Sequence, residues 1–243
     1  MKFYFEWDWA GADTEFRRAL ELNPGSRASH EEYGNFLIAL DRLDEALTHS
    51  RRAAELDPLS TGPVHDIAIN YLVRGDYDQA ALNFRRTIDI DPNWTWGYIK
   101  LARTLAHQKK CTESLAQAEI AERRIADGVA PTSRSWLGFT YAICGETARA
   151  RKALDWLESL SRKQYVDPVT VAVVYGGLGE VDEALRWYEK AFEDRTPNMV
   201  YAPILPRINH ELAGNARFEA IVRRMGYPPS GIPGSTGLPG AVN

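Results

Sequence analysis

Apolar and small residues recur along most of the chain with a period of 34 residues. Within each period they form two stripes whose members are three or four positions apart, and this spacing places them on one face of a helix. The pattern therefore predicts pairs of short amphipathic helices. One column of small residues, which lets the two helices of a pair approach closely, consists of Ala12, Ala46, Ala80, Ser114, Ala150 and Ala184.

Turn-forming residues recur with the same period. Pro24, Pro58 and Pro92 follow the second stripe at intervals of 34, where a proline stops a helix. Glycines at 75, 145 and 179 fall between the two stripes, where a left-handed residue closes a helix. Residues 169–175 are rich in β-branched side chains and look like a strand, but the period assigns them to the first helix of a unit. We give more weight to the period because propensity is a weak guide.

These columns resemble the tetratricopeptide repeat (TPR) family, whose unit is a 34-residue helix-turn-helix. The unit with Leu137-Gly138, Tyr141, Ala150 and Leu154 shows the resemblance best. Further matches are Ala46, Ala53 and Pro58 in one unit and Ala80, Phe84 and Pro92 in the next. The resemblance implies an all-α, right-handed superhelical solenoid with a C-terminal capping helix.

The register divides the chain into units. A partial N-terminal unit with only its second helix is expected at 1–26, a C-terminal cap at 199–226 with a helix starting at Asn215, and a Pro/Gly-rich tail at 227–243. Aromatic residues from Phe3 to Trp9 crowd the N-terminal end. They indicate either the continuation of a longer array or an edge used for self-association. Five complete units are expected at 27–60, 61–94, 95–130, 131–164 and 165–198.

Composition excludes some functions. The 243 residues carry a net charge of −4, which disfavours nucleic-acid binding. No apolar run approaches the ~20 residues that a membrane span needs. Only two cysteines are present, Cys111 and Cys144, and we expect two free thiols in a cytoplasmic protein.

Catalytic and metal-binding motifs are scarce. The sequence has no GxxxxGK[ST] phosphate loop, and its five histidines show no metal-ligand spacing. The glycine-rich stretch 176–179 falls at a turn between two helices without a preceding strand. We therefore expect no enzymatic activity, no cofactor and no metal.

The candidate site is a surface. In TPR arrays the first helices of the units line a concave groove, and here these positions are unusually apolar. One helix adds a stripe with an aromatic and cations, which suits an acidic side chain or a C-terminal carboxylate; a merely solvated basic stripe is the alternative. The residues expected to bind a partner are Asn35, Ile69, Val73, Trp96, Lys100, Arg103, His107 and Phe139.

Two functions remain open. The first is a protein-interaction scaffold that holds a peptide or partner segment in the groove. The sequence is also similar to bacterial TPR regions that follow winged-helix regulator, adenylate cyclase or kinase domains, which implies the docking or sensor half of a larger regulator. The second is a regulatory domain that binds a small ligand inside the superhelix. The shape of the concave face separates them, because a trough fits a peptide and a closed cavity fits a small molecule.

Overall fold

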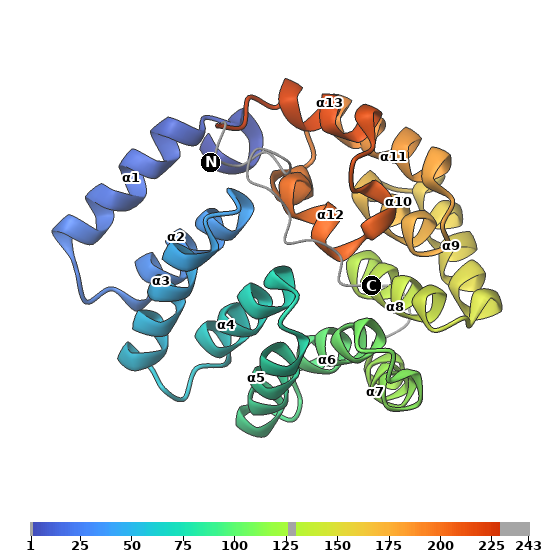
Figure 1. Cartoon of the computed structure of the whole chain (residues 1–243), viewed down its shortest axis with the longest axis horizontal. Helices are drawn as coiled ribbons and strands as arrows, with labels where there is room; N and C mark the ends of the chain where they lie inside the picture. Colours follow the sequence, from blue (N-terminus) through green and yellow to red (C-terminus); the bar gives the residue numbers. More distant parts are fainter. Residues whose placement is uncertain (1, 126–129, 229–243) are drawn as a thin grey trace.

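The computed structural model describes residues 2–125 and 130–228, and every regular element in these ranges is helical (Figure 1). Successive helices pack as antiparallel pairs, and each pair packs on the next. The predicted all-α repeat solenoid is therefore confirmed. The five pairs are α2 (Arg27–Ala39) with α3 (Leu43–Leu56), α4 (Thr61–Arg74) with α5 (Tyr77–Ile90), α6 (Thr95–His107) with α7 (Cys111–Arg124), α8 (Pro131–Ile143) with α9 (Thr147–Ser161), and α10 (Pro168–Gly177) with α11 (Val181–Glu193).

The turns inside the pairs share one backbone conformation. Gly75, Gly145 and Gly179 have φ values of 82°, 80° and 76°, in the left-handed region that glycine adopts without steric cost. Asp41 and Lys109 occupy the equivalent place in the other two pairs, with φ values of 58° and 62°. The predicted glycine turns are confirmed, and the repeat geometry imposes the same turn where glycine is missing.

The β-branched segment forms α10, as the period predicts. Asp167 caps this helix by accepting a hydrogen bond from the backbone N–H of Val169 at 2.9 Å, and Pro168 occupies the first turn. Val171 and Val174 are fully buried. Burial of α10 between its neighbours thus overrides the strand preference of its side chains.

Both ends of the chain add elements outside the five pairs. The C-terminal helix α13 begins after Asn215, whose side chain accepts hydrogen bonds from the backbone N–H groups of Arg217 and Phe218, as predicted. Residues 229–243, which make up nearly all of the predicted tail, lie outside the described residues. The added elements are the π-helical turn η1 (Lys2–Glu6) and α1 (Trp9–Leu22), then η2 (Pro197–Ile204), α12 (Leu205–Ile208), η3 (His210–Leu212) and α13 (Ala216–Arg224).

The first and last described elements meet, so the superhelix closes into a ring (Figure 1). The indole Nε1 of Trp9 donates a hydrogen bond to the carbonyl of Met225 at 2.9 Å, and its ring stacks on Tyr227 at 4.2 Å. Trp7 stacks on Phe192 at 5.4 Å. Both tryptophans are buried by this chain's own C-terminal part. The self-association expected at this edge stays a prediction.

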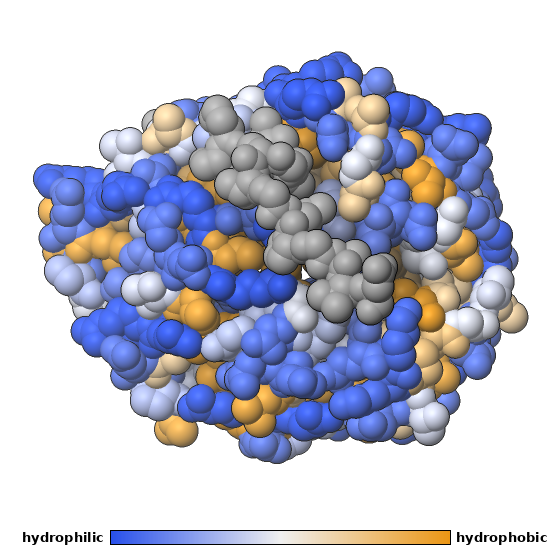
Figure 2. Space-filling model, in the orientation of Figure 1, coloured by the Kyte–Doolittle hydropathy of each residue, from blue (hydrophilic) through white to orange (hydrophobic). Residues whose placement is uncertain are grey.

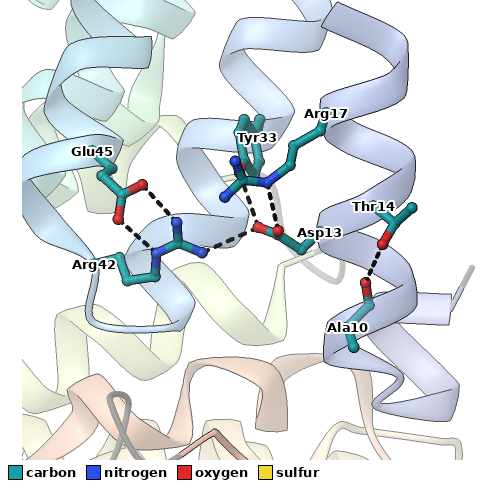
Figure 3. Close-up of polar contacts among 7 residues, drawn as sticks. All are labelled: Ala10, Asp13, Thr14, Arg17, Tyr33, Arg42 and Glu45. Carbon is teal, nitrogen blue, oxygen red and sulfur yellow. Dashed lines mark hydrogen bonds and ion pairs between the residues drawn. The ribbon is translucent and has the colours of Figure 1, made fainter.

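A partly buried carboxylate attaches α1 to the first complete pair (Figure 3). Asp13 accepts hydrogen bonds from Arg17 at 2.7 Å, from the hydroxyl of Tyr33 at 2.9 Å and from Arg42 at 3.1 Å. Arg42 also pairs with Glu45 at the start of α3. One side chain thus connects α1, α2 and the turn before α3. Partial burial acts to raise the pKa of Asp13, but these hydrogen bonds outweigh it and lower that pKa.

The prediction of two free thiols is wrong. Cys111 and Cys144 form a disulfide, with their Cα atoms 5.4 Å apart. Cys111 is the first residue of α7 and Cys144 directly follows α8, so the two lie at adjacent ends of neighbouring pairs. Their separation of 33 residues is close to one repeat, which is why they coincide in space. The expected cytoplasmic location rested partly on free thiols and stays a prediction.

Candidate functional site

The concave face of the ring is not an open trough, because the chain's own residues 197–208 lie on it. Segment η2 packs against α2, and α12 packs against α4, so α12 lies inside the ring in Figure 1. The next residue, Asn209, packs against Gly176 of α10. A Cβ atom at position 176 would lie only 1.9 Å from the amide nitrogen of Asn209. Glycine at 176 thus permits this close approach.

The face shown in Figure 2 is mainly hydrophilic, with hydrophobic residues visible in separate areas. The apolar positions of the first helices point inward instead. Ile38 and Val73 are 1% exposed, and Leu205 of the returning segment is 4% exposed. The groove that the sequence predicts is therefore largely covered by the C-terminal part of the chain.

A cavity of about 240 Å³ remains between the first helices and the returning segment. Six of the eight predicted site residues line it: Asn35, Ile69, Val73, Trp96, Lys100 and Arg103. The other lining residues are Ile38, His65, Asp66, Thr132, Ser135, Trp136, Val169, Thr170, Val173, Asn198, Tyr201, Ile204, Leu205 and Ile208.

Two cations from α6 lie at one end of this cavity. The Lys100 ammonium is 5.1 Å from the ring centre of Trp96 and 5.0 Å from that of Trp136. The Arg103 guanidinium lies 4.2 Å from the Trp136 ring centre. Lys100 and Arg103 are three residues apart in one helix, so they face the same side. The aromatic faces attract both cations but do not neutralise their charge.

Neither cation has an anionic partner among the described residues. Arg103 is 2% exposed, and its Nε atom is buried without a hydrogen-bond acceptor. Burial lowers the pKa of Arg103 to about 9, and it holds the pKa of Lys100 well below its usual value; the mutual repulsion of the two cations adds to the Lys100 shift. A buried, unpaired cation costs free energy that a bound anion would recover.

An acidic group lies elsewhere on the cavity wall. Asp66 of α4 is 6% exposed and accepts a hydrogen bond from the amide of Asn35 at 3.3 Å. Burial raises its pKa well above the usual value, and the nearby carboxylates of Glu31 and Glu32 raise it further. No described cation forms an ion pair with Asp66. The cavity thus has a basic end and an acidic residue that do not neutralise one another.

The remaining two predicted site residues lie outside the cavity. His107, the last residue of α6, stacks on Tyr77 with ring centres 5.2 Å apart, and it also approaches His210. Phe139 of α8 is 2% exposed and contacts the edge of Trp136. Both positions support the cavity from behind rather than lining it.

Sequence reasoning misses two groups of lining residues. Trp136 contacts both cations, but it belongs to neither the packing stripe nor the groove stripe of its repeat. The register assigns residues 199–208 to a cap, and only their strongly apolar composition, unusual for a solvated cap, could have indicated that they turn inward.

The burial of His107 gives the first testable prediction. Burial and the neighbouring cations lower its pKa to about 3, against about 6.5 in the unfolded chain. Between these values the unfolded state binds the extra proton, so this histidine destabilises the fold as pH falls below ~6.5. At pH 5.5 the cost is about 1.4 kcal/mol. His107→Phe keeps the stacking on Tyr77 and should remove this loss.

Urea unfolding of the wild type and of His107→Phe, each at pH 8 and at pH 5.5, checks this prediction. Asp66 and the other titrating groups are common to the two proteins, so the change in the difference between them isolates His107. Equal losses of unfolding free energy in wild type and variant would show that His107 is not responsible.

The helix pairs, their common turn and the inward-facing first helices define a helical-repeat solenoid. Residues 170–196 match the family model described as tetratricopeptide repeat. Together with the helix pairs along residues 27–193, this match supports a solenoid of the tetratricopeptide repeat type. No curated protein matches the sequence closely enough to count as a relative.

Solved structures agree with this assignment. A thermophilic TPR protein of Thermus thermophilus is 26% identical and superposes with a TM-score of 0.55, covering 74% of this chain and 99% of that one. A tetratricopeptide repeat protein from Parabacteroides merdae is 14% identical, with a TM-score of 0.54 and coverage of 90% and 86%. A chain of the APC/C hetero-tetramer Cut9–Hcn1 is 13% identical, with a TM-score of 0.61 and coverage of 91% and 47%.

The described part of the chain offers neither a metal-binding cluster nor a membrane span. Among residues 2–125 and 130–228, no three or more His, Cys, Asp or Glu side chains are grouped so as to hold a metal ion. Within the same ranges, none of the helices has the length and apolar character required to cross a bilayer.

Proposed function

We propose that this chain is a non-catalytic interaction scaffold whose concave cavity binds an acidic group between Lys100 and Arg103. One observation carries the proposal: two neighbouring cations are enclosed beside a cavity without a carboxylate partner among the described residues. Folding alone gives no reason to retain such a pair, because apolar side chains would fill the same place at lower cost.

The occupant that best fits the cavity is small. TPR solenoids offer a concave surface that commonly binds extended partners, but here residues 197–208 cover much of that surface. The remaining volume of about 240 Å³ is below the ~300–1,000 Å³ of sites for drug-sized ligands. Of the two functions that the sequence left open, this supports a small carboxylate over an extended peptide. In such a role the chain would be the sensor part of a larger assembly.

The apolar walls define the rest of the ligand. Branched aliphatic side chains from α4, α10 and α12 face the cavity, and Trp96 and Trp136 border its basic end. A carboxylate with a short hydrocarbon body would pair with the cations and fill the apolar part. We therefore choose 4-methylpentanoate as the first probe.

Arg103→Met tests the proposal, because it separates binding from folding. Loss of a charge-assisted contact should weaken 4-methylpentanoate binding about tenfold or more, as measured by titration calorimetry. The same change removes an unpaired buried cation, so the free energy of unfolding should stay equal or rise. A structural arginine would behave in the opposite way, with lower stability.

Arg85→Met on α5 is the matched control, because Arg85 is exposed and its guanidinium lies 3.8 Å from the Glu113 carboxylate on the outer surface. This variant should leave binding unchanged. If Arg103→Met binds 4-methylpentanoate as tightly as wild type, the proposed carboxylate site is wrong.

A further inference from the structure

The second charged group on the cavity wall narrows the class of ligand. Asp66 is a buried carboxylate, and its side chain forms no ion pair with Lys100, Arg103 or any other described cation. Its hydrogen-bond partner, the amide of Asn35, is 3.3 Å away and is neutral. Asp66 and the two cations line the same cavity, so one bound molecule can contact both.

We propose that the cavity binds a small zwitterion, an amino carboxylate with an apolar body, whose carboxylate lies between Lys100 and Arg103 and whose ammonium group faces Asp66. This inference deepens the proposed function and rests on it. An anion alone would satisfy the basic end and leave Asp66 unpaired, whereas a zwitterion supplies a partner for each end and brings no net charge into the cavity.

The surroundings of Asp66 favour a cation at this place. The carboxylates of Glu31 and Glu32 act on Asp66 through space and disfavour a further negative charge there, which a bound cation would offset. The ring of Tyr201 lines the same cavity, and aromatic faces attract ammonium groups. The amide oxygen of Asn35 is a further acceptor, since Asn35 turns its nitrogen toward Asp66.

Much of the cavity wall is apolar. It includes Ile69 and Val73 of α4, Val173 of α10, and Ile204 and Leu205 of the returning segment. These side chains exclude water from the body of the ligand, which strengthens both ion pairs. The size of the cavity and these walls fit a single amino acid with an aliphatic side chain, or an amino carboxylate of similar length.

The inference is tested with two pairs of probes that differ only in the amine. L-leucine is compared with 4-methylpentanoate, and 6-aminohexanoate is compared with hexanoate, each by titration calorimetry against the full chain. The two pairs cover adjacent and distant spacings of amine and carboxylate. At least one zwitterion should bind about tenfold or more tightly than its amine-free partner.

Asp66→Asn keeps the shape of the side chain, but the amide cannot ionise to pair with an ammonium group. In this variant the preference for the zwitterion over its amine-free partner should be lost. Glu55→Gln is the control, because Glu55 is an exposed carboxylate at the end of α3. This variant should keep the preference for the zwitterion. Retention of the zwitterion preference in Asp66→Asn would overturn the assignment of the ammonium site.

The outcomes separate this inference from the proposed function. If the amine-free acids bind and the zwitterions bind no better, the carboxylate site stands and the zwitterion class is wrong. If none of the four probes binds, the carboxylate site and the zwitterion class are both wrong. If L-leucinamide, which lacks the carboxylate, binds as tightly as L-leucine, the role of Lys100 and Arg103 is wrong.

Discussion

Replacing Trp9 with alanine should open the ring and lower the free energy of unfolding by about 3–5 kcal/mol, the usual cost of deleting a buried tryptophan. Trp9 is 6% exposed and stacks on Tyr227 at 4.2 Å. Its indole nitrogen also donates a hydrogen bond to the Met225 carbonyl, which the truncation leaves without this donor. The contact joins residues 216 positions apart in the sequence.

This single contact matters more in a repeat protein than in a compact domain. A linear solenoid contacts only its neighbours, so its ends fray independently. Here the Trp9 contacts join α1 to the residues that follow α13, and an ion pair of 2.7 Å joins Asp41, in the turn between α2 and α3, to Arg207 of α12. Because the ring is closed, the helices at its two ends should unfold together. The closed ring also holds residues 197–208 in place over the cavity.

Urea unfolding and hydrogen exchange measure the two parts of this prediction. Trp9→Ala should shift the unfolding midpoint and increase exchange in both α1 and the segment from η2 to α13, although they lie at opposite ends of the sequence. Leu22→Ala is the control, because Leu22 lies on the same helix α1 and is 70% exposed. Faster exchange confined to α1 would show that the two ends unfold independently and that ring closure contributes little to the free energy of unfolding.

The repeat register predicted the helices because its columns are packing positions. Ala46, Ala80, Ala150 and Ala184 are fully buried in the structure. A pattern that repeats every 34 residues reports local packing, so it located even the β-branched helix α10 correctly. The same register, with the charge pattern of one helix, indicated the residues expected to bind a partner, and six of those eight line the cavity.

The repeat pattern could not predict that the ring closes. Contacts between α12 and α4, or between Trp9 and Met225, join segments that no periodic column relates. The returning segment also changed the character of the site, from a groove to a cavity. His107 and Phe139 share the register of the groove residues but do not line the cavity, because His107 stacks on Tyr77 and Phe139 packs on Trp136.

Loss of the Cys111–Cys144 disulfide should lower the free energy of unfolding by about 3–4 kcal/mol, the second largest effect that we expect. The bond joins residues 33 positions apart, and the chain-entropy estimate for a loop of this length gives about this value. It spans the start of α7 and the end of α8 and so fastens two neighbouring repeats. Those repeats carry Lys100, Arg103 and Trp136 at the basic end of the cavity.

The measurement is thermal unfolding with and without dithiothreitol. Reductant should lower the melting temperature of the wild type but leave that of the double variant Cys111→Ala/Cys144→Ala unchanged, because the variant has no bond to lose. The double variant itself should melt near the reduced wild type. If reductant changes nothing in the wild type while mass spectrometry shows both thiols free, the repeats are held by packing alone. A loss of stability together with weaker 4-methylpentanoate binding would instead show that this bond also maintains the geometry of the two cations.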